Sequence, residues 1–474
     1  MVGTILLFKT LYNLTFNIIN FCLTFLMKQN SSGNTKNFRV EKAYKIIGNT
    51  RNMEKPINLK DLTLLVPILL IPIFGSLALG LILIVAIFLI FYFTIKNNHD
   101  NTPPPFKTLG VIFTSYFTYF AVQGFFYSSS FFQHIHDIGK IFPILVIGIL
   151  ALLLKTNTFK INHKMISLVA VSSIYLTSFL ALFWRFLYYP QLRILGTNFS
   201  EKTGIHGRLE MGTGNALPFA TIFITFAFLT CLGYKRKSIL EKILSFSALI
   251  LAISIIGSWN GSRGPLLLVA PLTFLMLWYL FKNGQSEKTW RPIILGSTVV
   301  TLLAVTFIIM QGFGHFNSQN MVDGLKELTS PGNYDASVNE RLVLYEAGFK
   351  AFFVNPIFGF GIGNLLESVS QFFPKDVSFG HTHLHNIFLN HLIAGGLVGL
   401  PFLFMLATSP LLILWQKRNF ITIDDIYLSL LIVITIFGAG MSNVLFFHDL
   451  LGGFFSVLIL IAAIASKKKI PIDD

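Results

Sequence analysis

Charged residues and cysteines are both scarce in this chain. Asp, Glu, Lys and Arg together make up 12% of the 474 residues, too few to cover the surface of a soluble protein of this length. The two cysteines, Cys22 and Cys231, lie in apolar segments and provide neither a disulfide framework nor a zinc-binding spacing. The chain also lacks internal repeats and glycine-rich nucleotide motifs. These absences argue against soluble, disulfide-stabilised and nucleotide-dependent classes.

Apolar residues are abundant and account for 53% of the chain. Runs of about 20 apolar residues recur, which is the length a helix needs to cross a bilayer. The sequence therefore predicts an all-α polytopic membrane protein with about 12 transmembrane helices. The segment 62–93 is too long for one helix, and its prolines and glycines predict two short spans with a break at Gly75-Ser76. The other predicted spans centre near 107–126, 138–154, 165–187, 215–234, 239–258, 264–281, 292–311, 386–415, 426–446 and 449–466.

The net charge of +15 follows from this topology, so no nucleic-acid partner is expected. Lys and Arg concentrate in the cytoplasmic loops of membrane proteins. With the N-terminus inside, every second loop carries at least two cations, at Lys96/Lys107, Lys155/Lys160/Lys164, Lys235/Arg236/Lys237/Lys242, Lys282/Lys288/Arg291, Lys417/Arg418 and Lys467/Lys468/Lys469. This orientation places two long segments outside, 188–214 and 312–385.

The predicted organisation has four parts. Residues 1–60 are a poorly defined extension, and Met53 is an alternative start. Residues 61–311 hold the first nine spans, and 312–385 form a large outer loop that contains short helices. Residues 386–474 hold the last three spans and a cytoplasmic tail. Since long loops in compact proteins tend to carry function, the large outer loop is the first place to look for a site.

Three histidines alternate in "GHTHLHN", residues 380–386. In an extended chain His381, His383 and His385 point to one face, and three readings stay open. A metal site would need a defined set of ligands, and no fourth ligand is obvious. A solvated loop end before the next helix is the plainest reading. The third is a general base, because histidine exchanges protons near neutral pH.

Three arginines lie on the same predicted side. Arg263, in "NGSRGPLLLV", sits at the outer mouth of a span, where a cation serves either as an interfacial anchor or as an anion ligand. Arg341 shares a predicted helix face with Tyr345, and Arg208 precedes another span in "HGRLEMGTGNALPFA". Because the guanidinium fork suits phosphate oxygens, this combination favours a lipid-linked pyrophosphate. "GFGIG" lacks a preceding strand and is predicted to be a turn rather than a phosphate loop.

Five segments together resemble the O-antigen ligases and related O-antigen polymerases of Gram-negative bacteria. They are "GTGNALPFA", "NGSRGPLLL", "NERLVLYEAGFKAFFVNPIFGFGIGN", "HTHLHNIFLNHLIAGGLVGL" and "GMSNVLFF". Their order and spacing carry the resemblance across roughly residues 60–465.

The resemblance implies a metal-independent, inverting glycosyltransferase of the inner membrane without a cofactor. It would move O-antigen from undecaprenyl pyrophosphate to the lipid A–core acceptor at the periplasmic face, with membrane lipid around it. Arg263 and Arg341, and by position Arg208, would bind the donor pyrophosphate. His385 would be the base with His383 beside it, although either of the two could hold that role, and His381 has no strong counterpart.

An O-antigen polymerase shares the same arginine and "HN" elements and stays an alternative. A transporter of lipid-linked sugars would need charges at mid-membrane and repeat symmetry, whereas the span interiors are mostly apolar, Lys140 and Arg185 lie near span ends, and no repeat is present. A purely structural membrane protein would not need arginines on two outer loops.

Overall fold

The computed structural model describes residues 59–95, 102–127, 131–154, 159, 161–188, 216–257, 262–284, 336–374, 383–418 and 421–465. The chain divides into Met1–Pro56 and Ile57–Asp474, and every described residue belongs to the second part. The predicted N-terminal extension, the alternative start at Met53 and the predicted span at 292–311 lie outside the described residues.

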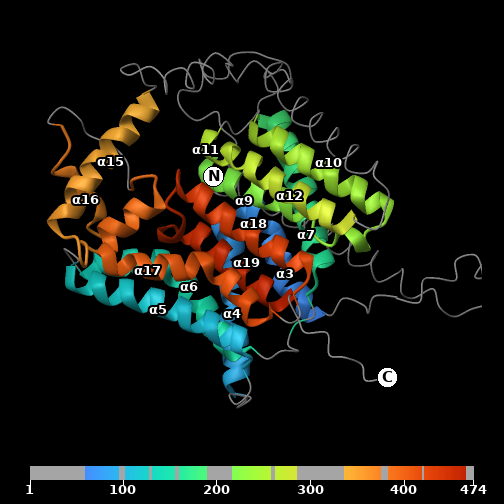
Figure 1. Cartoon of the computed structure of the whole chain (residues 1–474), viewed down its shortest axis with the longest axis horizontal. Helices are drawn as coiled ribbons and strands as arrows, with labels where there is room; N and C mark the ends of the chain where they lie inside the picture. The colour runs from blue at the N-terminus through green and yellow to red at the C-terminus, as the bar shows by residue number, and fades with distance from the viewer. Residues whose placement is uncertain are drawn as a thin grey trace, which may run out of the picture. The chain divides into compact units, whose positions relative to one another are not determined.

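Every regular element in the described ranges is helical (Figure 1). The helices are α3 (Leu59–Phe74), α4 (Ser76–Ile95), α5 (Pro104–Tyr127), α6 (Phe131–Leu153), α7 (His163–Tyr188), α9 (Ala216–Leu229), α10 (Ile239–Ile255), α11 (Arg263–Leu267), α12 (Val269–Gly284), α15 (Ala336–Val354), α16 (Leu365–Ser370), α17 (Ile387–Gln416), α18 (Ile423–Gly440) and α19 (Asp449–Ala465), with short 3₁₀ turns η3 (Tyr234–Arg236) and η6 (Leu445–Phe447).

Seven of the described helices are long and apolar enough to cross a membrane, and three shorter apolar helices accompany them. This is the architecture of a multi-pass membrane protein. The count of about twelve spans and the orientation stay predictions. The predicted break at Gly75 is confirmed, because α3 ends at Phe74, α4 begins at Ser76 and Gly75 has φ 49°. Glycine adopts this left-handed conformation without steric cost.

The core surrounds α19, which is buried on all sides from Leu450 to Ile464. It contacts α4, α5, α6, α9, α17 and α18. A helix that is apolar on every face belongs in an interior. Near it, α17 runs alongside α5 (Figure 1).

The long helix α17 is bent back on itself at Gly396, where φ is 61° and ψ is −161°. The rings of Phe388 and Phe404 are 6.0 Å apart, whereas a straight helix would separate these positions by about 24 Å. The helix before Gly396 therefore packs against the helix after it, and we call this arrangement the α17 hairpin. The sequence predicted the extent of this helix, as 386–415, but not the bend.

The break at the tip of the α17 hairpin frees backbone groups that would be costly to leave unbonded in an apolar region. The loop 356–361 and two side chains of α5 satisfy them. The Ile393 carbonyl accepts from Phe360 N at 2.8 Å, and the Ala394 carbonyl accepts from Gly361 N at 2.9 Å and from Gln123 Nε2 at 2.6 Å. The Gly395 carbonyl accepts from Tyr119 Oη at 2.6 Å. After the bend, Leu397 N donates to the Pro356 carbonyl at 2.8 Å, and Val398 N donates to the Ile357 carbonyl at 3.1 Å. "GFGIG" is thus a turn, as predicted, and it fills a helix break.

Lys237 was predicted to be an ordinary loop cation, but the structure buries it to 6% exposure. Its Nζ donates to Ser167 Oγ at 2.6 Å, to Ser245 Oγ at 2.7 Å and to the Thr230 carbonyl. Burial lowers the pKa of Lys237 to about 8, against attraction from neighbouring groups such as Glu241. Hydrogen bonding to three oxygens offsets part of the desolvation of this amine.

We expect the thermal stability of the protein to rise with pH because of Lys237. The folded-state pKa of about 8 lies below the ordinary 10.5, so the unfolded chain binds more protons between these values. Stability should therefore increase as pH rises from about 8 towards 10.5. Thermal unfolding midpoints of the detergent-solubilised protein at pH 7.5 and 9.5 measure this difference. It should shrink in Lys237→Met and persist in Lys235→Met, whose side chain is exposed. An equal pH response in both variants would contradict it.

Candidate functional site

The segment "HLHN", the described part of the histidine motif, leads directly into the α17 hairpin. Asn386 is the N-cap of α17, and its Oδ1 accepts hydrogen bonds from Phe388 N (2.9 Å) and Leu389 N (3.1 Å). Such a cap satisfies amide groups that have no partner within the helix. Asn386 therefore fixes the start of the helix at Ile387, two residues after His385.

His383 and His385 lie side by side, as their alternation in the sequence predicts. Their ring centroids are 4.4 Å apart with an interplanar angle of 63°, and both residues are partly buried. Leu384 between them is fully buried, so it anchors the segment in the core. His385 has φ 51°, a left-handed conformation that is uncommon for residues with a side chain and often marks functional positions.

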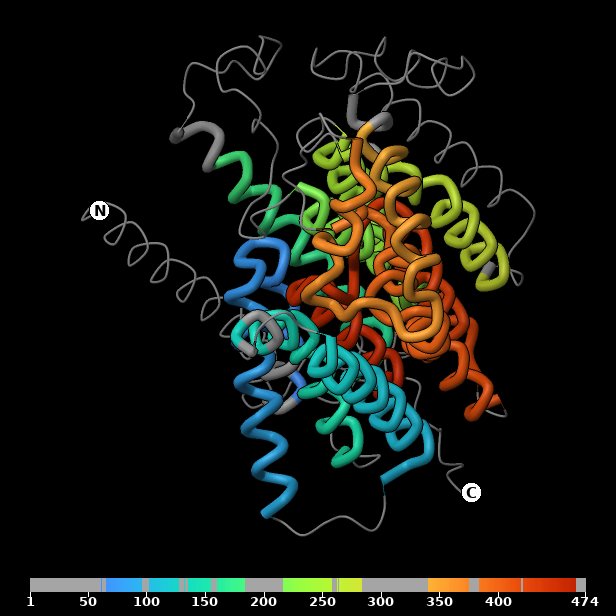
Figure 2. The backbone as a smooth tube through the Cα atoms, turned by 90° about the vertical axis from the view of Figure 1, so that its left-hand side faces the viewer, coloured from blue at the N-terminus to red at the C-terminus, as the bar shows by residue number. Residues whose placement is uncertain are grey.

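Helix α15 packs against α17 (Figure 2), and its residue Tyr345 reaches the histidine segment. The Tyr345 hydroxyl lies 3.4 Å from the carbonyl oxygens of His385 and Met441 and can donate to them. At Gly348, a Cβ atom would lie 3.0–3.2 Å from side chains of the α17 hairpin and of Leu384, so α15 and α17 approach closely there. This contact aligns α15 with the histidine segment.

Arg341 lies one helical turn before Tyr345 and is partly exposed. No described acidic side chain forms an ion pair with it. Burial raises the pKa of the Tyr345 hydroxyl, and the positive charge of Arg341 opposes that rise. A guanidinium with no described acidic partner is suited to bind an anion. On the same helix, Glu346 and Lys350 form an exposed 2.7 Å pair.

Arg263 is the first residue of α11, and its side chain lies outside the described part of the structure. The next residue, Gly264, sits so close to Ser442 that a Cβ atom would overlap the serine hydroxyl. Ser442 follows Met441, whose carbonyl is within reach of Tyr345. The backbone of Arg263 therefore lies near the end of α18, on the side of the histidine segment.

The structure thus brings His383, His385 and the backbone of Arg263 near the end of α18 and the start of α17, and Arg341 lies one helical turn from Tyr345, which reaches the same place. The predicted residues Arg208 and His381 lie outside the described residues. No group of three or more His, Cys, Asp or Glu with metal-binding geometry occurs among the residues that the structure describes. Histidine side chains can transfer protons near neutral pH, and an arginine can bind an anion.

No role was predicted for His391, which is fully buried within the α17 hairpin. Its Nδ1 is 2.7 Å from the Ile387 carbonyl and its Nε2 is 2.8 Å from the Tyr116 hydroxyl. A carbonyl only accepts, so Nδ1 carries the proton and Nε2 accepts from Tyr116. The ring also stacks on Phe447 with centroids 4.2 Å apart. The only sequence signal was a polar residue within an apolar run.

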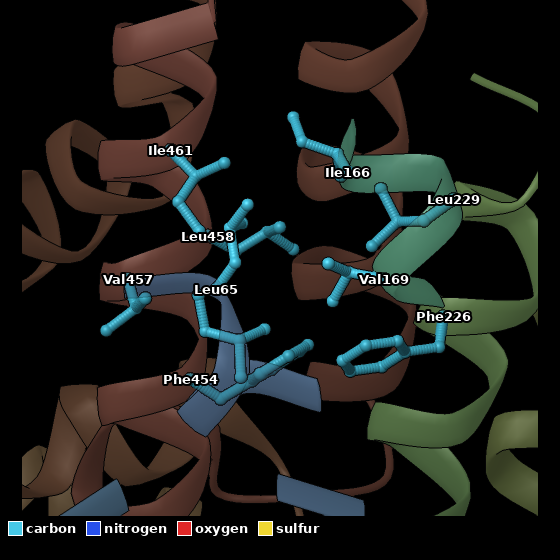
Figure 3. Close-up of a pocket in the computed structure, with 10 residues that line it drawn as sticks. Leu65, Ile166, Val169, Phe226, Leu229, Phe454, Val457, Leu458 and Ile461 are labelled. Atoms are coloured by element: carbon cyan, nitrogen blue, oxygen red, sulfur yellow. The ribbon is translucent and has the colours of Figure 1, made fainter. Parts of the chain in front are cut away.

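A small cavity between α3, α7, α9 and α19 lies elsewhere (Figure 3). Its ten lining side chains are all apolar, so it offers no partner for a phosphate or a sugar. The cavity extends to Ile461 in the C-terminal half of α19. The histidine segment instead lies near Met441, which precedes the N-terminus of α19. The cavity is therefore not a candidate for the reaction site.

A protein-family model described as O-antigen ligase matches residues 246–405. The matched segment contains Arg263, Arg341, His383 and His385, as well as the bend at Gly396. No curated protein matches the chain. The segment 246–405, which holds the cluster described above, is therefore similar to the O-antigen ligase family.

Proposed function

We propose that the protein is an O-antigen ligase that transfers glycan from undecaprenyl pyrophosphate to lipid A–core. The observation that carries this proposal is the contact of Tyr345 of α15, one helical turn after Arg341, with the backbone of the His383–His385 pair, inside the segment that matches the family. Such a transfer needs a base beside the acceptor hydroxyl and a cation beside the departing diphosphate. Histidine and arginine are suited to these two tasks. The proposed location is the inner membrane, with the cluster facing the periplasm.

The proposed reaction needs no metal and no nucleotide. His385 takes the proton from an acceptor hydroxyl while that oxygen forms a bond to the anomeric carbon. The bond between the anomeric carbon and the diphosphate oxygen breaks, and the undecaprenyl diphosphate leaves with the bonding electrons. Arg263 and Arg341 stabilise the charge on the departing diphosphate. Attack on the face opposite to the leaving group inverts the anomeric configuration.

Two acceptors test the proposal. The full chain in liposomes is given an undecaprenyl-pyrophosphate-linked oligosaccharide and either lipid A–core or more of the same lipid-linked repeat unit, without ATP or a divalent metal. Transfer to lipid A–core supports the ligase. Extension of the lipid-linked glycan would instead identify a polymerase, and the absence of both products would overturn a glycosyltransferase role.

We expect Arg341→Ala and Arg263→Ala each to slow transfer by about 10²–10³-fold, because each removes a contact to the developing diphosphate charge. The lysine variants should also lose most activity, since lysine keeps the charge but not the bidentate fork. Lys350→Ala is the matched control, because this cation lies on α15 but pairs with Glu346 at the exposed surface. Wild-type rates in both arginine-to-alanine variants, at equal amounts in the membrane, would reduce these arginines to interfacial anchors.

A further inference from the structure

The side chain of Asn390 bonds to the backbone on both sides of His385. Its Oδ1 accepts a hydrogen bond from Leu384 N at 3.2 Å, and its Nδ2 donates to the Asn386 carbonyl at 2.6 Å. Asn390 is fully buried, as is Leu384. One amide therefore closes a bridge from α17 to the two residues that flank His385.

The backbone at His385 needs such a restraint. A residue with a side chain at φ 51° is in a sparsely populated conformation, which persists only where its surroundings hold it. The hydrogen bond from the Tyr345 hydroxyl to the His385 carbonyl is long, at 3.4 Å. The cap bonds of Asn386 go to Phe388 and Leu389, so they hold the helix start rather than the residues before it.

Loss of the amide would release this backbone conformation. The Leu384 N–H is buried with its side chain, and without Asn390 it would have to find another acceptor. The simplest relaxation returns His385 to a negative φ, which changes the direction in which its ring projects. Proton transfer depends steeply on that direction, because misplacement by about 1 Å can cost 10²-fold in rate.

We infer that Asn390 is a positioning residue that fixes the imidazole of His385 for proton transfer. The inference rests on the proposed role of His385 as the base and adds the residue that holds it in place. Both ends of the amide are required. Aspartate keeps an oxygen that accepts from Leu384 N, but its second oxygen cannot donate to the Asn386 carbonyl. An apolar side chain can neither accept the first bond nor donate the second.

The test is a double-mutant cycle on transfer from undecaprenyl-pyrophosphate-linked oligosaccharide to lipid A–core, with the full chain in liposomes. Asn390→Ala and Asn390→Asp should lower kcat by about tenfold to a hundredfold, with the KM for the donor within about twofold because the arginines still bind the diphosphate. In a His385→Ala background, Asn390→Ala should cause no further loss, since Asn390 acts through that ring. Ser456→Ala, which removes another buried side chain-to-backbone bond in α19, is the control for general destabilisation.

The outcomes separate this inference from the proposed function. A strong loss in His385→Ala together with full activity in Asn390→Ala overturns the positioning role and leaves the base in place. The positioning role is also overturned if the fold-losses in kcat of Asn390→Ala and His385→Ala multiply in the double variant. It is overturned as well if the loss in Asn390→Ala only reflects a lower amount of folded protein, as in Ser456→Ala. Full activity in His385→Ala removes the base and this inference with it.

Discussion

Replacing His385 with alanine is expected to slow glycan transfer by about 10²-fold or more, the usual contribution of a general base. Binding of the lipid-linked donor should survive, because the arginines proposed to bind the diphosphate are on α11 and α15 rather than on the histidine segment. The measurement is the initial rate of transfer to lipid A–core at saturating donor, together with the donor KM.

The neighbouring histidines provide the controls for this result. His383→Ala should be intermediate, because its ring contacts that of His385 at 4.4 Å, and His381→Ala should be mild. Chelation with EDTA should leave all rates unchanged. A loss of activity in EDTA that zinc restores would show that the histidines bind a metal, and full activity in His385→Ala would reduce the segment to a loop end.

Gly396→Ala is expected to have the largest effect on the folded protein. The φ of 61° and ψ of −161° at this position lie in a region that is essentially restricted to glycine, and backbone strain of this kind costs about 1–3 kcal/mol. A Cβ atom would also overlap the Ile357 carbonyl and lie 2.7 Å from Gly359 N. The tip of the α17 hairpin would have to open, so both the thermal midpoint and the transfer rate should fall.

Gly80→Ala is the matched control for this substitution. Gly80 lies within α4, and a Cβ atom there would meet nothing within 4 Å, so alanine should be neutral or slightly stabilising. Both variants can be compared by thermal unfolding in detergent and by the amount of monodisperse protein. If Gly396→Ala unfolds at the same temperature as Gly80→Ala, the bend in α17 does not have the conformation described here.

Local signals in the sequence predicted those parts of the fold that depend on neighbouring residues. Gly75 marked the break between α3 and α4, because glycine favours a helix end where φ turns positive, whereas Pro67 and Pro72 are accommodated within α3. The bend at Gly396 was not predicted. The pair Gly395-Gly396 is tolerated in a straight apolar helix, and the groups that stabilise the break come from distant parts of the chain.

The same distinction applies to the candidate site. The contact between His383 and His385 follows from their spacing, and so does the shared face of Arg341 and Tyr345. Asn390 was missed, because an asparagine in an apolar run does not reveal which backbone groups it will bond to. Only the folded chain shows that its amide reaches back to Leu384 and Asn386.

The bonds at the tip of the α17 hairpin also set an order of assembly during synthesis. Tyr119 bonds to a carbonyl 276 residues further along the chain, and Gln123 to one that is 271 residues away. At about 5–20 residues per second, translation needs roughly 14–55 s to cover that distance. During this interval Tyr119 and Gln123 of α5 do not yet have their final hydrogen-bond acceptors. The candidate site therefore cannot be completed before Gly395 has been synthesised, so a chain that ends before this residue should lack the bonds at the tip of the α17 hairpin.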